Sequence, residues 1–228
     1  MMMLYVISAV FGVVGMLVSA RLKSKFSHYA LVPVTNGMTG RDVAEAMLKY
    51  YNIHDVQVTA VEGTLTDHYN PQDKTVNLSQ DVYYGNHVSA AAVAAHECGH
   101  AVQHATAYTA LTMRSRLVPI VSLSANLQQY LFMFGVVGMA SFNSPLLLII
   151  AIAAFGVTAL FSLITLPVEF DASSRALVWL NHTNVVSGAE YDGAKDALRW
   201  AALTYVVAAL AAVAQLVYLV MMFMSRRD

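Results

Sequence analysis

Two histidines and a glutamate stand within five residues, in the run His96-Glu97-Cys98-Gly99-His100. If this run is helical, His96 and His100 lie four residues apart on one face and can present ring nitrogens to one metal ion. Zinc lowers the pKa of a bound water to about 7, and a neighbouring carboxylate can take its proton as the water attacks a carbonyl group. Glu97 is placed to be that carboxylate. The pattern predicts zinc-dependent hydrolysis.

The alternative is a metal-free helix in which these three side chains are satisfied by their neighbours. A buried glutamate without a partner is costly, and an ion supplies the partner, so the metal site is favoured. Gly99 weakens a helix by roughly 1 kcal/mol relative to alanine, which indicates that another element packs closely there. Cys98 is the single cysteine of the chain, so the sequence offers neither a disulfide framework nor a cysteine metal cluster.

A catalytic zinc normally has three protein ligands, so one more must come from elsewhere in the chain. Glu169 and Asp171, in the run LPVEFDASSRAL, are candidates, as is Asp192, which precedes a glycine as the aspartate ligand of intramembrane zinc proteases does. We favour Glu169, whose alternative role is a solvated cap at the start of a helix. Asp171 is more plausible as a group that orients a ligand or pairs with Arg175.

Long uncharged runs indicate the elements around this site. Residues 1–20, 117–168 and 200–225 contain no charged side chain. A membrane span needs about 20 apolar helical residues, so the first and last runs each fit one span. The middle run fits a hairpin of two helices, at 117–140 and 146–167, because the polar, helix-breaking cluster SFNSP divides it. A signal peptide is the less favoured interpretation of residues 1–20, which lack a positively charged start.

The hairpin returns the chain to the side that it left. Residues 21–116 and 168–199 therefore share one side, and their Lys and Arg residues place that side in the cytoplasm. The composition, with 57% hydrophobic and 12% charged residues, agrees with a membrane protein. The net charge of −1 offers no field for a nucleic-acid partner.

The region 21–116 carries helix and strand patterns. Thr39 and Asp42 form a capping-box pattern that predicts a helix up to about Tyr51. The runs DVQVTAV, GTLTDHY and TVNLS, with a turn at NPQDK, predict two or three short antiparallel strands. From Ser89 the sequence is apolar on nearly every side, which predicts a buried helix that carries the two histidines. The expected fold class is a mainly α membrane protein with about four transmembrane helices and a small α+β catalytic region.

Residues close in sequence to the two histidines are candidates for further roles. The strand TVNLS precedes the active helix and is a candidate to pair with an extended substrate, although an ordinary buried strand is an equally good interpretation. His68 and Tyr69 are candidate donors to a developing oxyanion or to substrate. His104 fits a core or capping histidine better than a fourth ligand.

The runs TDHYNPQDKTVNLSQDVYYGNHVSAAAVAAHECGHAVQHA, RSRLVP and LPVEFDASSRAL resemble the YugP-type neutral zinc metallopeptidases, which are bacterial membrane proteins. The resemblance implies a gluzincin-like peptidase with a zincin-like region, in which His96, His100 and Glu169 bind zinc and Glu97 is the catalytic acid and base. It also implies distant similarity to HtpX and the CAAX-processing proteases, in which an aspartate stands four residues after the third ligand. Here that position is Ser173, which leaves Asp171 as the candidate for its role.

We therefore expect a zinc endopeptidase of the bacterial inner (plasma) membrane, with its site on the cytoplasmic side and peptides or membrane proteins as substrates. One alternative is an intramembrane protease in which Asp192 is the third ligand. Another is a metal-binding membrane scaffold without activity. Small residues in the last span would also allow a homo-oligomer or a membrane partner protein.

Overall fold

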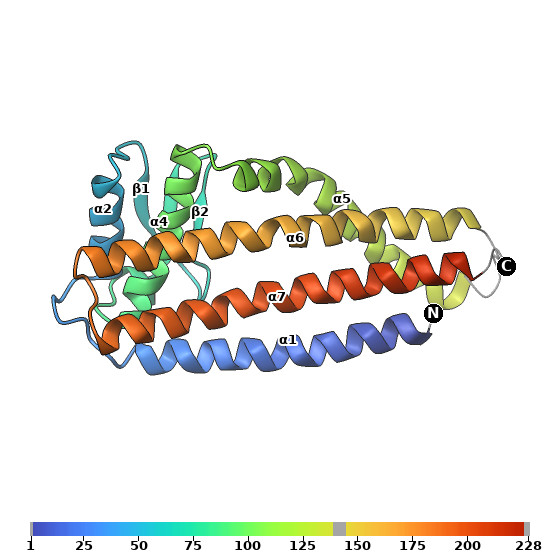
Figure 1. The fold of residues 1–228 in the computed structure, drawn as a ribbon, viewed down its shortest axis with the longest axis horizontal. Coiled ribbons are helices and arrows are strands. Elements are labelled where there is room, and N and C mark those ends of the chain that lie inside the picture. The colour runs from blue at the N-terminus through green and yellow to red at the C-terminus, as the bar shows by residue number, and fades with distance from the viewer. Residues whose placement is uncertain (1, 139–144, 226–228) are drawn as a thin grey trace. The chain divides into compact units, whose positions relative to one another are not determined.

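A computed structural model describes residues 2–138 and 145–225 of the chain (Figure 1). The elements, in order, are α1 (Met2–Tyr29), α2 (Gly40–Tyr50), β1 (Gln57–Val61), β2 (His68–Asn70), β3 (Thr75–Ser79), α3 (Gln80–Tyr83), α4 (Val88–Ala105), α5 (Thr109–Gly138), α6 (Pro145–His182) and α7 (Ala189–Met224). They fall into two compact units. The helical unit comprises Met1–Leu17, Met113–Leu166 and Thr204–Asp228, and the α+β unit comprises Val18–Thr112 and Pro167–Leu203.

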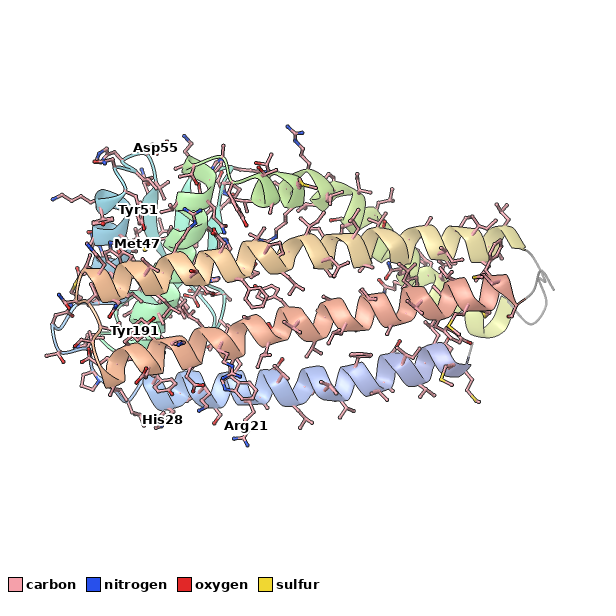
Figure 2. All side chains as sticks on the ribbon, viewed as in Figure 1. Arg21, His28, Met47, Tyr51, Asp55 and Tyr191 are labelled. Carbon is pink, nitrogen blue, oxygen red and sulfur yellow. The ribbon has the colours of Figure 1, made fainter. Side chains whose placement is uncertain are left out.

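Helix α2 begins as its sequence predicts. The Thr39 side chain accepts a hydrogen bond from the Asp42 backbone N–H, and the Asp42 carboxylate accepts one from the Thr39 N–H at 2.9 Å, which completes the capping box. One face of the helix, which includes Met47, is buried, and Tyr51 follows its last turn (Figure 2). The predicted helix is confirmed.

The three strands form a mixed sheet in the order β1-β3-β2. Strand β2 pairs antiparallel with β3 across the predicted turn, but β1 pairs parallel with β3, so the expectation of an antiparallel sheet was wrong. The centre goes to β3 because it is the most buried strand, with Val76 and Leu78 fully covered. Residues Thr75 to Asn77 of β3 are paired on both sides, which contradicts the suggested pairing with substrate over these residues and agrees with the other interpretation, an ordinary buried strand.

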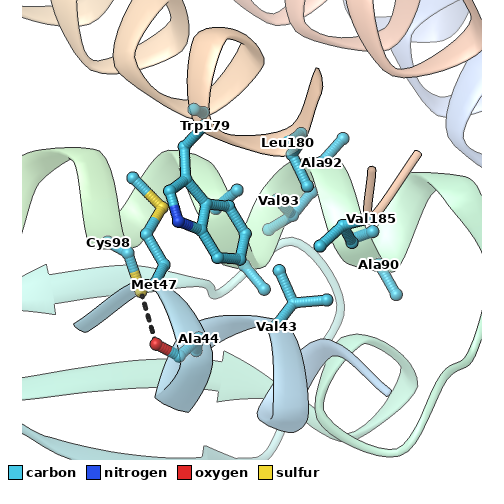
Figure 3. Packing of buried hydrophobic residues seen from close by; sticks show 14 of the residues in the cluster. Val43, Ala44, Met47, Ala90, Ala92, Val93, Cys98, Trp179, Leu180 and Val185 are labelled. Atoms are coloured by element: carbon cyan, nitrogen blue, oxygen red, sulfur yellow. Dashed lines mark hydrogen bonds between the residues drawn. The ribbon is translucent and has the colours of Figure 1, made fainter. Parts of the chain in front are cut away.

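Helix α4 lies at the centre of the α+β unit. Nearly all its residues are buried, as its unbroken apolar character predicts. They pack against α2 and against the part of α6 that carries Trp179 and Leu180 (Figure 3). Cys98 is fully buried on the α2 side, where its Sγ donates to the Ala44 carbonyl oxygen at 3.6 Å, so it is a core residue. Packing on both sides therefore fixes the position of α4.

The helical unit has its own small core, formed by Leu4, Leu148, Ala151, Phe155 and Leu219. Polar contacts add to it, since the Gln215 amide donates to Ser8 Oγ at 3.0 Å.

Three helices of the described residues are long and apolar enough to cross a membrane, namely α1, α6 from Leu146 and α7. Helix α5, on which the fourth expected span falls, is not among them, and four spans are not confirmed. Its described part contains Pro119 and several polar residues. The expected hairpin turn lies mostly outside the described residues.

Candidate metal centre

Three side chains of the α+β unit converge on one point. One donor atom from each of His96, His100 and Glu169 lies within 4.8 Å of the other two. Glu169 Oε2 is 3.3 Å from His96 Nε2 and 3.5 Å from His100 Nε2. We call these three residues the triad. Two imidazoles and a carboxylate are a donor set that catalytic zinc uses, and three ligands leave one coordination position open.

Glu169 reaches the triad from the interior of a helix. Helix α6 is continuous from Pro145 to His182, and Glu169 is only 2% exposed, so the interpretation of this residue as a solvated helix cap was wrong. Asp192 lies exposed in the first turn of α7 and is not part of the triad.

Gln103 determines which ring nitrogen of His100 carries the proton. The Gln103 Nε2 group donates to the Val168 carbonyl oxygen and to Asp171 Oδ2, both at 2.8 Å. The side-chain oxygen of Gln103 is therefore the atom that faces His100 Nδ1, at 3.0 Å. Because an amide oxygen only accepts, Nδ1 carries the proton, and the Nε2 lone pair is left for a metal.

Asp171 and Ser173 support the two histidines from α6. Asp171 accepts from Gln103 and, at 2.6 Å, from Arg175 Nε, so it orients His100 through Gln103 and also pairs with Arg175. Ser173 Oγ lies 3.0 Å from His96 Nδ1 and can accept a hydrogen bond from its N–H in the same way. A serine thus contacts His96 at the position where the resemblance implied an aspartate. Sequence reasoning missed Gln103, although its place three residues after His100 puts it on the same helix face.

We expect Gln103→Ala to weaken zinc binding by about 10- to 100-fold, because His100 Nδ1 loses its acceptor and Asp171 loses one of its two donors. Competition for zinc with a chromophoric chelator measures the affinity. Gln72→Ala, at an exposed turn, is the control and should bind as the wild type does. Equal affinity in the Gln103 variant would show that this amide does not support the site.

Glu97 lies beside the triad and outside it. The residue is 8% exposed, and its Oε2 accepts a hydrogen bond from the Tyr69 backbone N–H at 3.0 Å. The Tyr69 hydroxyl lies 2.7 Å from His104 Nδ1, so the Tyr69 ring extends along α4. The hydrogen bond between Glu97 and β2 could not be predicted from the sequence, because it depends on how the sheet packs onto α4.

The pKa values of two buried groups in α4, His100 and Cys98, are shifted by their surroundings. Burial alone would lower the pKa of His100, but the carboxylates of Glu169 and Glu97 outweigh it and raise the pKa above the ordinary value. Burial raises the pKa of the Cys98 thiol, which keeps this residue inert. His68 is exposed, and its Nδ1 lies 2.8 Å from the Thr66 carbonyl oxygen, so its suggested contact with substrate stays a prediction.

Comparison with known proteins decides the family. Residues 2–224 match the family model described as "Putative neutral zinc metallopeptidase". The chain belongs to this metallopeptidase family. It is also 41% identical over 208 residues, or 91% of each chain, to the "Putative membrane protease YugP" of Bacillus subtilis (strain 168). No solved structure is significantly similar to it. The relative and the three apolar helices together indicate a membrane protein.

Membership of a zinc metallopeptidase family implies zinc, and the triad fits that metal. Its donor atoms are two imidazole nitrogens and a carboxylate oxygen, and Gln103 and Ser173 orient the histidines for coordination through Nε2.

Gly99 lets α4 and α6 approach each other closely. A Cβ atom on Gly99 would lie 2.6 Å from the Ala172 carbonyl oxygen and 3.1 Å from Ala172 Cα. These are backbone atoms of α6, so a side chain would push the helix that carries Glu169 away from the two histidines. The close packing that the sequence predicts at this glycine is confirmed.

We expect Gly99→Ala to destabilise the protein by about 1–3 kcal/mol through overpacking, although alanine is the better helix former. Thermal unfolding measures the effect. Gly15→Ala in α1 is the control, because nothing lies within 4 Å of its added Cβ, and it should be neutral or stabilising. An unchanged melting temperature for Gly99→Ala would contradict the tight approach.

Proposed function

We propose that this chain is a membrane-embedded zinc endopeptidase of the gluzincin kind, with His96, His100 and Glu169 as ligands and Glu97 as catalytic acid and base. The observation that carries the proposal is the position of Glu97. Its carboxylate is buried next to three converging donor atoms but is held by the Tyr69 N–H rather than by the triad. A site that only bound metal would not need this additional carboxylate.

Zinc, when bound, supplies a Lewis acid that polarises the scissile carbonyl and acidifies water. Glu97 takes the proton from the attacking water and passes it to the leaving amine nitrogen. The Tyr69 N–H holds Oε2 of Glu97, so the carboxylate keeps its direction through both transfers. Gln103 and Ser173 keep the two imidazole rings in place.

We propose that the peptide substrate binds along the outer edge of β2. Tyr69 is opposite Val76 in the antiparallel pair, yet its N–H donates to Glu97. Such an outward N–H marks a position that is not hydrogen-bonded to β3, where the carbonyl oxygen also points outward. Because Glu97 already accepts from the Tyr69 N–H, an extended substrate would bond to the Tyr69 carbonyl oxygen at this edge and lie beside Glu97.

We further propose that the substrates are membrane proteins or their segments next to the membrane, cut on the cytoplasmic side. Three apolar helices in a chain of this length support the proposal. In zinc-loaded proteoliposomes, a reporter peptide tethered by a transmembrane helix should be cleaved faster than the same peptide free in solution. The rate of the Glu97→Gln variant is the background. Equal rates for the two reporters would contradict the preference for membrane substrates.

A further inference from the structure

A pocket of about 300 Å³ opens beside the candidate site within the α+β unit. Its lining comes from the last turns of α1, the connection between β1 and β2, the end of β3, helix α3 and the first turns of α4. The α1 contribution lies between Arg21 and His28, which are labelled in Figure 2. The residues assigned to metal binding and to proton transfer are not among the lining residues.

Two lining residues connect this pocket to the site. Val93 stands four residues before Glu97, so the two share a face of α4. Asp67 stands two residues before Tyr69, whose N–H holds Glu97. A peptide on the outer edge of β2 would therefore pass from Glu97 toward Asp67, and a side chain near its scissile bond would point into the pocket.

The pocket combines apolar walls with one sheltered negative charge. Phe26, Val82 and Val93 supply apolar wall. Lys23 and Asp81 are exposed and carry opposite charges, whereas Asp67 is partly buried. Asp67 is therefore the carboxylate of the lining that is sheltered from solvent.

Asp67 is only partly satisfied by the protein. Its Oδ1 accepts from the Ser79 backbone N–H at 2.7 Å, and the Ser79 hydroxyl lies 3.1 and 3.2 Å from Oδ1 and Oδ2. A carboxylate has about four acceptor sites, so Asp67 retains room for a further donor.

We infer that this pocket is a specificity pocket for a Lys or Arg side chain of the substrate, with Asp67 binding the cationic end. The apolar walls suit the long methylene stem of such a side chain, and the carboxylate suits its charge. The inference rests on the proposed peptidase function and names its substrate class. Segments of membrane proteins that flank their spans on the cytoplasmic side are rich in Lys and Arg, so the two proposals agree.

The electrostatics of Asp67 are consistent with such a ligand. Burial raises the pKa of Asp67, and the charge of Glu97 raises it further, although the Ser79 hydrogen bonds oppose both. A bound cation would stabilise the ionised carboxylate against burial and repulsion.

The test measures cleavage preference in a mixture of peptides of known sequence. Full-length protein in detergent is loaded with zinc, and mass spectrometry locates the cut bonds. The wild type should prefer Lys or Arg over Leu or Met at one position next to the cut. Asp67→Asn should reduce that ratio by about tenfold, the loss expected for one partly buried charge pair.

Two further variants separate charge from structure. Asp67→Glu keeps the charge and should retain the preference, whereas Asp73→Asn removes an exposed charge at the β2–β3 turn and should not change it. Zinc content and thermal unfolding are measured on each variant, so that a folding defect is recognised. If Asp67→Asn does not fold, the wild-type preference alone decides.

Cleavage by the wild type without preference for Lys or Arg would overturn the inference and leave the proposed peptidase intact. An equal preference in wild type and a folded Asp67→Asn variant would also overturn it. If zinc-loaded wild type cleaves no peptide or tethered reporter, the proposed function fails, and this inference fails with it.

Discussion

Replacing Glu97 by Gln should abolish peptide hydrolysis and leave zinc bound. Glutamine is nearly isosteric and its side-chain oxygen can still accept the Tyr69 N–H, so the packing around α4 should persist. It cannot take a proton from water, and loss of a general base costs about 10²- to 10⁴-fold in rate. Turnover of a tethered reporter and elemental zinc analysis on the same preparation measure the two effects.

Glu62→Gln provides the matched control, since Glu62 is an exposed glutamate that follows β1. It should retain both zinc and activity. Two outcomes would count against the mechanism. Equal activity in Glu97→Gln would remove Glu97 as the base, and loss of zinc from this variant would show that Glu97 contributes to metal binding.

Glu169→Ala should lose zinc, and activity with it. The substitution removes one of the three proposed ligands and leaves the buried His100 imidazole and the half-buried His96 imidazole facing an enlarged space. Wild type should hold near one zinc per chain by elemental analysis after purification without chelators.

Asp192→Ala is the informative comparison, because this residue is the ligand that an intramembrane protease would use. Asp192 is exposed at the start of α7, and its removal should leave the zinc content unchanged. Zinc loss in Asp192→Ala alone would favour the intramembrane protease, and wild type without zinc would favour a scaffold without activity.

Local patterns predicted much of this structure. The capping box at Thr39 and Asp42 involves residues three apart, so the first turn of the helix determines the contact. The spacing of His96 and His100 likewise depends only on helix geometry. The burial of α4 was predicted from its apolar residues. The close approach at Gly99 was predicted from the cost of a glycine inside a helix.

Contacts between segments that lie far apart in the sequence were harder to predict from it. Strand β1 pairs parallel with the central strand β3, and alternation along each strand specifies neither its neighbours nor their direction. Gln103 acquires its role from Val168 and Asp171, 65 and 68 residues further along the chain. The hydrogen bond from the Tyr69 N–H to Glu97 forms only when the sheet has packed onto α4. Such arrangements arise from tertiary packing that no short motif encodes.

The continuity of α6 has a consequence for biogenesis. The two histidines are synthesised well before Glu169, and the apolar stretch from Leu146 that leads to Glu169 in the same helix is a candidate membrane span. The nascent chain therefore lacks Glu169, the third proposed ligand, until this stretch has left the ribosome. A newly made chain thus lacks one of the three proposed zinc ligands during early translation, so the proposed site can be completed only after this span has been made.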